Sequence, residues 1–227
     1  MKKLVLTTLV VTAAYLMSCE PEDSADVNQD RIWTAYELFY NENNDKTIAI
    51  ARFKFGNSLG TLLELNDPAV VRFNGDELSY NPIYAGHARE YAGKLTSGTF
   101  EYVNVDGEVF TNIIPTLNEI AFPDNFTTIT KGQANSFKWD GTALAGRERV
   151  NVFVGSWTWG DDAAIFTTGA GLDEVVMGSD QVDDLPLGPA TCHMDRVNAA
   201  EATEVPEAGG EVRTRYKASN VPVEVAE

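Results

Sequence analysis

The chain has few of the residues that usually build catalytic or metal sites. Its 227 residues include only two histidines, His87 and His193, and two cysteines. It has no Gly-x-Ser-x-Gly motif, no His-Glu-x-x-His motif and no phosphate-binding glycine-rich loop. The usual sequence signatures of serine hydrolases, zinc proteases and nucleotide-binding enzymes are therefore missing. We expect a non-catalytic protein with no resident cofactor.

Basic residues are also scarce. Lysine and arginine together number 17 against 34 aspartate and glutamate residues, which gives a formal net charge of −17. A surface this acidic repels phosphate backbones and anionic headgroups. We therefore expect no nucleic-acid partner. Because the chain has no polybasic patch, attachment to a membrane would need a different device.

Long hydrophobic runs are absent except near the start, at residues 4–17. This run follows two lysines and is too short to cross a hydrocarbon core of roughly 30 Å, as is typical of a secretory signal peptide. The sequence Leu16-Met17-Ser18-Cys19 resembles the bacterial lipobox, in which the cysteine is acylated and becomes the new N-terminus. The resemblance implies a signal peptide at residues 1–18 and a membrane anchor through lipid on Cys19. An ordinary secretory signal with a chance cysteine is the alternative.

The residues after Cys19 carry information about location. Glu20 stands where an aspartate would resemble an inner-membrane retention signal, and residues 20–23 resemble the acidic surface-export signals of Bacteroidota lipoproteins. Asp23-Ser24-Ala25 resembles the O-glycosylation sites of that phylum, with Ser24 as acceptor. These resemblances imply a lipid-anchored protein of the outer membrane or cell surface. Residues 19–30 contain little apolar surface and are predicted to form a flexible tether.

The second cysteine is predicted to be structural. With lipid on Cys19, Cys192 has no disulfide partner, so the chain is not a disulfide-stapled domain. Strand alternation places Cys192 on one face with Ala190 and Met194, and His193 on the other. We therefore expect a buried thiol rather than a nucleophile.

From residue 31 onward, apolar residues recur with a period of two, which indicates β-strands. Residues 31–40 and 47–55 predict a hairpin. Asn74-Gly75 and Asp106-Gly107 predict tight turns of type I′. Further strands of this first block are expected at residues 62–65, 69–73, 77–80, 98–103 and 109–114.

A second block follows the segment 115–123. Its expected strands are residues 118–122, 135–139, 149–155, 163–167, 174–177, 188–196 and 211–218. The spacing predicts an all-β fold of two tandem immunoglobulin-like β-sandwiches, at residues 31–115 and 116–227. Across most of the chain, this pattern resembles two-domain surface lipoproteins of Bacteroidota.

Two tryptophans are the best candidates for ligand contact. Trp157 and Trp159 share one strand face, and acidic Asp161 and Asp162 follow them. Three valines of opposite parity are predicted to fill the core: Val150, Val152 and Val154. The indoles would then face outward, where they could stack on a sugar ring or contact a protein. The alternative is a bulge that buries both rings.

One short segment has the ligand spacing of a calcium loop. Asp26, Asn28 and Asp30 offer oxygen atoms on alternate residues. Arg31 stands where such a loop needs glycine, and its charge opposes a cation. Capping of turns by the Asx side chains is the alternative to calcium binding.

The sequence therefore predicts a non-catalytic, membrane-anchored surface lipoprotein that binds a protein partner or a glycan. One alternative is a structural or accessory subunit of an outer-membrane envelope complex, which a large flat apolar patch would favour. A third is an enzyme whose site has no sequence signature, which converging histidine and carboxylate side chains would favour.

Overall fold

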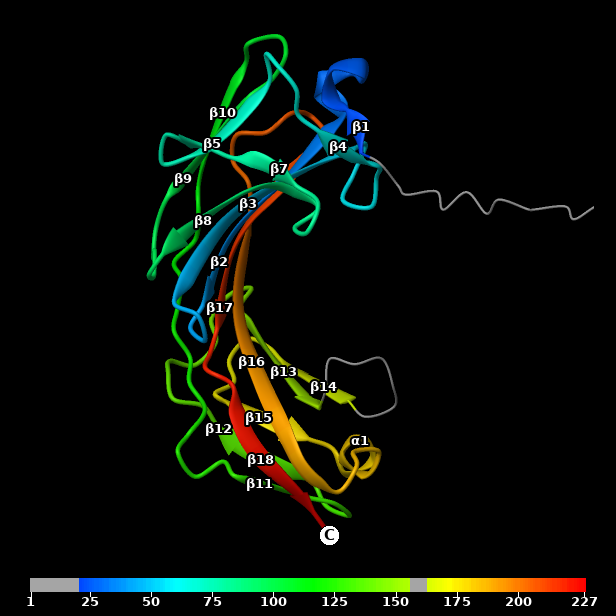
Figure 1. Cartoon of the computed structure of the whole chain (residues 1–227), viewed down its shortest axis with the longest axis vertical. Coiled ribbons are helices and arrows are strands. Elements are labelled where there is room, and N and C mark those ends of the chain that lie inside the picture. The colour runs from blue at the N-terminus through cyan, green and yellow to red at the C-terminus, as the bar shows by residue number, and fades with distance from the viewer. Residues whose placement is uncertain (1–20, 156–162) are drawn as a thin grey trace, which may run out of the picture.

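The structure, a computed structural model, describes residues 21–155 and 163–227, with side chains for all of these except residues 163–168. The fold is all-β, as predicted (Figure 1). The upper half in Figure 1 contains β1 (Glu22–Asp23), η1 (Ser24–Asp26), η2 (Gln29–Arg31), β2 (Ile32–Asn41), β3 (Lys46–Phe55), β4 (Leu62–Glu64), β5 (Val70–Phe73), β6 (Asp76–Glu77), β7 (Ser79–Asn81), β8 (Gly86–Ala92), β9 (Thr99–Val103) and β10 (Val109–Ile113).

The remaining elements follow in chain order. They are β11 (Thr128–Thr130), β12 (Asn135–Lys138), β13 (Arg149–Gly155), β14 (Ala163–Thr168), β15 (Glu174–Met177), α1 (Ser179–Asp183), β16 (Gly188–Glu201), β17 (Gly210–Lys217) and β18 (Val221–Ala226).

One large sheet runs through the whole molecule. It has twelve strands, with the central order β1-β4-β3-β2-β17-β16-β13-β14. Strands β7 and β8 extend it at β3, and β18 and β11 extend it at β16. Strand β17 joins the two halves, because it pairs parallel with β2 and antiparallel with β16 (Figure 1).

Two hydrophobic cores lie on the same face of this sheet. Val212 belongs to the first core and Tyr216 to the second. They are four residues apart on β17, so their side chains project from one face. The small sheet β10-β9-β5-β6 contributes Phe73, Phe100 and Tyr102 to the first core, while β12, β15 and α1 contribute to the second.

The predicted hairpin is confirmed, because β2 and β3 pair antiparallel along their full lengths. The Asn74-Gly75 turn is also confirmed, with φ angles of 51° and 88° between the paired residues Phe73 and Asp76. The hairpin predicted at Asp106-Gly107 is confirmed, since β9 and β10 pair antiparallel on either side of it, but the type I′ turn is not, because only Gly107 of the two residues has a positive φ angle. There the Asn104 side chain accepts hydrogen bonds from the Asp106 and Glu108 amides (3.1 and 2.9 Å) and builds a longer loop.

The all-β prediction holds, whereas the division into two immunoglobulin-like sandwiches at residues 115 and 116 stays a prediction. Ile114 belongs to the first core and Leu117 to the second, but the cores do not follow this boundary, since Tyr40 lies in the second core and Val212 in the first. Strand pairing also crosses this boundary, since β17 lies in the second predicted domain and β2 in the first.

Residues 21–30, the described part of the flexible tether expected at residues 19–30, are packed against the folded body. Strand β1 pairs parallel with β4, and Val27 packs against the first core. Gln29 is buried and donates from Nε2 to the carbonyl oxygens of Ser24 and Val27 (2.8 and 2.9 Å). These side-chain hydrogen bonds fix a segment whose low apolar content had indicated a free chain.

Candidate functional site

Several predicted site residues lie outside the described part of the chain. These are Cys19, Trp157, Trp159, Asp161 and Asp162. The last four fall between the end of β13 at Gly155 and the start of β14 at Ala163. Their roles in anchoring and ligand contact therefore stay predictions.

The predictions for the neighbouring strands are confirmed. Val150, Val152 and Val154 are fully buried, and so is Cys192. Burial raises the pKa of the Cys192 thiol to about 12, which makes it a poor nucleophile near neutral pH. His193 projects from the other face, where its Nδ1 lies 2.8 Å from Asn220 Oδ1.

The structure describes both the predicted modification residue and the candidate calcium segment. The Ser24 hydroxyl is buried without a hydrogen-bond partner among the described residues, so a glycan on Ser24 does not fit this packed segment. Asp26, Asn28 and Asp30 are exposed, and Asn28 Oδ1 accepts from the Asp30 amide (2.9 Å), as in an Asx turn. Among the residues described, no group of three or more His, Cys, Asp or Glu side chains could hold a metal ion.

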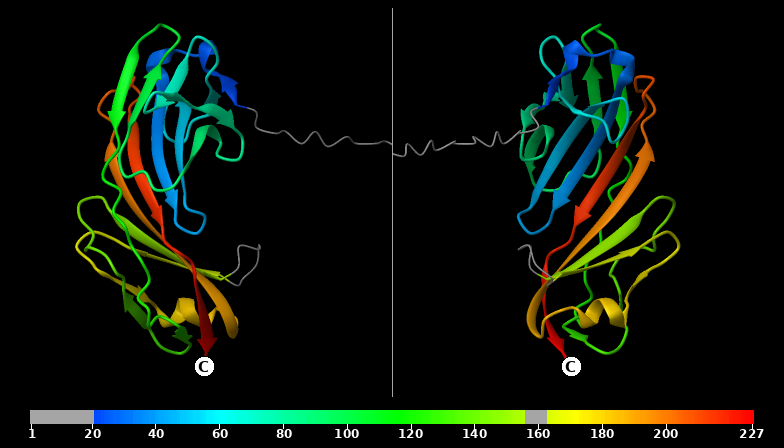
Figure 2. Two further views of the ribbon diagram at one scale, coloured as in Figure 1. Left: turned by 60° about the vertical axis from the view of Figure 1, so that its left-hand side comes forward. Right: turned by 90° about the vertical axis from the view of Figure 1, so that its right-hand side faces the viewer.

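The face of the large sheet opposite the two cores carries a group of charged residues. Glu37 on β2 lies between Arg52 on β3 and Arg213 and Arg215 on β17. Strands β2, β17 and β16 can be followed across this side in Figure 2 (right). We call these four residues the arginine face.

The arginine face is built around a buried carboxylate. The Glu37 side chain is 4% exposed, whereas those of Arg52, Arg213 and Arg215 are 23%, 30% and 35% exposed. Glu37 Oε2 accepts from Arg52 Nη1 (3.0 Å) and from Arg213 Nη2 (2.7 Å), and Glu37 Oε1 lies 3.7 Å from Arg215 Nε. Glu37 therefore orients Arg52 and Arg213 by hydrogen bonds and forms a longer ion pair with Arg215, and the outer parts of all three guanidinium groups reach solvent.

The electrostatics favour an ionised Glu37. Burial alone would raise the pKa of its carboxyl group. The charges of Arg213, Arg215 and Arg52 and the hydrogen bond from Arg213 outweigh this effect and hold the pKa below its ordinary value. A second carboxylate also lies in this group, with Glu211 Oε1 3.9 Å from Arg213 Nη1, so the three arginines leave only a small local excess of positive charge within an acidic chain.

Aromatic and acidic residues surround this group. The Arg215 guanidinium carbon lies 3.8 Å from the centroid of the Phe39 ring, a cation–π contact that fixes the side chain. Farther along the face, the rings of Phe153 and His193 are 5.7 Å apart. Asp195 lies on the same face, and burial raises the pKa of its carboxyl group despite the charges of Arg215 and Lys217.

His193 and Asp195 do not form an obvious acid–base pair. The His193 ring already contacts Asn220, and burial lowers its pKa. Asp195 Oδ1 is buried without a hydrogen-bond partner among the described residues.

His87 is held inside the first half of the molecule. Its Nε2 accepts from the Leu65 amide (3.0 Å), and its Nδ1 lies 3.4 Å from the Leu78 carbonyl oxygen. The ring therefore carries its proton on Nδ1. Burial lowers the pKa of His87. A hollow of about 220 Å³ adjoins this ring, but both of its nitrogens are already engaged.

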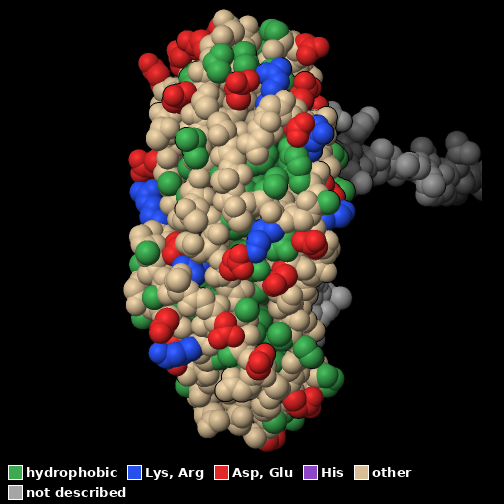
Figure 3. Space-filling model, turned by 90° about the vertical axis from the view of Figure 1, so that its left-hand side faces the viewer, with side chains coloured by type: hydrophobic (Ala, Val, Ile, Leu, Met, Phe, Trp, Pro, Cys, Tyr) green, Lys and Arg blue, Asp and Glu red, His purple; other side chains and the backbone are tan. Residues whose placement is uncertain are grey.

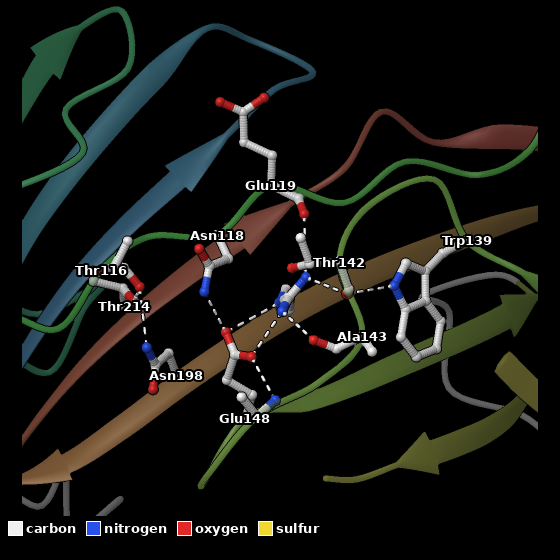
Figure 4. Close-up of polar contacts among 11 residues, drawn as sticks. Thr116, Asn118, Glu119, Trp139, Thr142, Ala143, Glu148, Asn198 and Thr214 are labelled. Carbon is white, nitrogen blue, oxygen red and sulfur yellow. Dashed lines mark hydrogen bonds and ion pairs between the residues drawn. The ribbon is translucent and has the colours of Figure 1, made fainter. Parts of the chain in front are cut away.

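A second charged pair is structural. Arg196 donates to the carbonyl oxygens of Thr142 and Ala143, while Glu148 accepts from Asn118 and from the Ala145 amide. Figure 4 shows Asn118, Thr142 and Ala143 arranged around Glu148. This network is closed to solvent and cannot bind a ligand.

On the opposite side from the arginine face, acidic and basic side chains are interspersed with small hydrophobic groups (Figure 3).

Sequence reasoning missed the arginine face, although it left two signals. Glu37 is a lone acidic residue within the apolar strand β2, and β17 alternates charged Arg213 and Arg215 with buried residues. What joins them is the parallel pairing of β17 with β2, which brings Glu37 opposite Arg213 across 176 positions. A pairing this remote leaves no local pattern in the sequence.

Neither sequence comparison identifies a relative of this chain. In residues 21–155 and 163–227, no helix is long and apolar enough to span a bilayer. No family model matches the chain, and no curated protein sequence is detectably similar to it.

Proposed function

We propose that this chain is a non-catalytic lipoprotein of the outer membrane or cell surface that binds a protein partner or a glycan. Its anchor is lipid on Cys19, and its binding surface is the arginine face. The observation that supports this proposal is the clustering of three partly exposed arginines around the buried Glu37.

The chemistry of this cluster favours an acidic group as the ligand. Guanidinium groups bind carboxylates, sulfates and phosphates through paired hydrogen bonds. Because Glu37 is buried, a ligand would meet the guanidinium groups rather than the carboxylate that pairs with them. Because the ends of the Arg213 and Arg215 side chains are partly exposed, they need not be rearranged before binding. Trp157, Trp159, Asp161 and Asp162 stay predicted contacts of the same function.

Charge-matched variants test the proposal. Arg215→Gln removes a guanidinium from the arginine face, and Arg147→Gln removes one from an exposed pair with Glu201. Binding would be measured to polygalacturonate, to a sulfated glycan and to a poly-glutamate peptide, together with recovery of proteins from native membranes. We expect Arg215→Gln to weaken binding about tenfold, or about 1.4 kcal/mol, and Arg147→Gln to have little effect.

The same measurements separate the alternatives. Equal binding by the two variants would show that the arginine face is not the site. Stable recovery of envelope proteins that is insensitive to Arg215→Gln would favour an accessory subunit. Cleavage of one of the polymers would favour an enzyme.

A further inference from the structure

We infer that two neighbouring loops form the surface through which the folded body contacts the bilayer. They are residues 56–61, between β3 and β4, and residues 82–85, between β7 and β8. We call them the contact loops, and their apolar tips are Leu59 and Ile83. The inference rests on the proposed lipid anchor at Cys19 and names the surface that the anchor brings to the membrane.

The short connection to the anchor requires such a surface. Glu22, the first residue of β1, follows Cys19 by three positions. Three residues span at most about 10 Å. A lipid chain places its cysteine at the headgroup level, so β1 cannot move far from the bilayer. The part of the body around the start of β1 must therefore lie at the membrane.

Strand pairing identifies which loop lies there. Strands β1 and β4 are parallel, with Glu22 opposite Leu63 and Asp23 opposite Glu64. Parallel strands begin at the same end, so the chain enters β1 beside the residues that precede β4. Those residues are the contact loop 56–61.

The second contact loop is held next to the first by β3. Arg52 Nε donates to the Tyr84 carbonyl oxygen (2.9 Å), and Lys54 Nζ donates to the Ser58 carbonyl oxygen (2.6 Å). Arg52 and Lys54 are alternate residues of one strand, so they project from the same face about 7 Å apart. In Figures 1 and 2, the loop between β7 and β8 lies on the side of the molecule where β1 begins.

The tips of both loops are unusually exposed apolar residues. Leu59 is 92% exposed and Ile83 is 86% exposed, whereas the other exposed large hydrophobic side chains of the described residues range from 52% to 73%. Two such side chains beside a lipid anchor can enter the boundary between headgroups and acyl chains.

Both tips are built in the same way. The Leu59 amide donates to Asn57 Oδ1 (2.8 Å), and the Ile83 amide donates to Asn81 Oδ1 (3.0 Å). Each loop is thus an Asx turn that satisfies its own backbone and holds an apolar side chain outward. Little conformational freedom has to be lost when the tips enter the bilayer.

The surroundings give no net attraction to an anionic membrane surface. The acidic Glu22, Asp23 and Glu64 on β1 and β4 offset the basic Arg52 and Lys54 on β3. The contact is therefore apolar, with lipid on Cys19 as the main anchor. Arg52 touches both a contact loop and Glu37, so the arginine face lies close to the membrane and can reach molecules carried by it.

Fluorescence quenching in vesicles tests the inference. Leu59→Cys, Ile83→Cys and Leu187→Cys would each be labelled with a fluorophore in the full lipidated protein. Leu187 is a matched control, because it is exposed and precedes β16 at the opposite end of the molecule (Figure 1). The native Cys192 is fully buried and should not take the label. The vesicles would contain phosphatidylcholine and a phosphatidylcholine with a nitroxide near its headgroup.

We expect the labels at positions 59 and 83 to lose most of their fluorescence and the label at 187 to keep it. The protein could instead float with the vesicles while none of the labels is quenched, or while all three are quenched equally. Either result would show that the contact loops do not contact the bilayer, although the proposed lipid anchor would be retained. If mass spectrometry finds no lipid on Cys19 and the protein does not float, the proposed anchor is wrong and the inference falls with it.

Discussion

Arg196 and Glu148 form an ion pair that is almost completely closed to solvent. Arg196 Nη2 lies 2.7 Å from Glu148 Oε2, and the two side chains are 1% and 3% exposed. The pair connects β16 to the chain just before β13. The same guanidinium group also donates hydrogen bonds to the carbonyl oxygens of residues 142 and 143. Burial alone would raise the pKa of Glu148, but hydrogen bonds from Arg196, Asn118 and the Ala145 amide hold the pKa below its ordinary value.

Removing one partner of this pair should be costly. Arg196→Met leaves the Glu148 carboxylate buried without its counter-charge, which typically costs about 3–5 kcal/mol. The matched control is Arg147→Met, since Arg147 pairs with Glu201 at the surface and such pairs contribute roughly 0–1 kcal/mol. Urea unfolding of both variants checks the prediction. Similar free energies of unfolding for the two would contradict the structural role of the buried pair.

A second prediction concerns acid sensitivity. Because burial holds the pKa of His87 below its ordinary value of 6.5, the unfolded chain takes up a proton before the folded chain does. The free energy of unfolding should therefore fall as the pH drops below 6.5 toward the folded pKa of His87. Above pH 6.5, His87 should add no pH dependence.

Thermal or urea unfolding across pH 5 to 7 checks this effect by comparing wild type with His87→Gln. The variant should be less stable at pH 7, because it disturbs the hydrogen bond from Leu65, but its stability should change less with pH. His193→Gln should reduce the slope as well, because burial also lowers the pKa of His193, although this residue is less buried than His87. An unchanged slope in His87→Gln would mean that His87 titrates normally in the folded state.

Asp195 provides a prediction of the opposite sign. Burial raises the pKa of its carboxyl group, so the stability linked to this residue is present below pH 3.8 and is lost as the pH rises through the folded pKa. Asp195→Asn should thus stabilise the protein at pH 7. Asp173→Asn, at an exposed position paired with Lys138, should change stability by no more than about 0.5 kcal/mol. Destabilisation by Asp195→Asn would show that the charges of Arg215 and Lys217 outweigh burial.

Local patterns predicted much of the fold. Alternation located the long strands β2, β3, β13 and β17, because each has one face in a core and one face outside it. It missed β8, β11, β18 and α1, of which β11 and α1 are short and β8 is largely exposed. The segment 118–122 was expected to be a strand but contributes only the single bridge between Ala121 and Asp140. Its Ile120 and Phe122 are buried as core residues without a neighbouring strand to extend the pairing.

The candidate site was less accessible to sequence reasoning than the fold. Burial of Cys192 followed from its apolar neighbours in the same strand. The arginine face instead depends on long-range pairing, and the contact loops depend on the parallel register of β1 with β4. Both relationships join segments whose sequences contain no sign of one another. Side-chain capping by Gln29 and Asn28 likewise turned an expected tether into packed structure.

The last prediction concerns Trp157 and Trp159. The buried valines of β13 fix the inward parity of that strand up to Gly155, where the strand ends. If the parity continued, both indoles would face outward, and the double alanine variant would cost within about 0.5 kcal/mol for each residue. Buried indoles would instead cost about 3–5 kcal/mol each, through lost transfer free energy and a cavity. One urea denaturation curve separates these outcomes. A stable variant that no longer binds its protein or glycan ligand would support the contact role, whereas a variant that fails to fold would overturn it and leave the arginine face as the remaining candidate site.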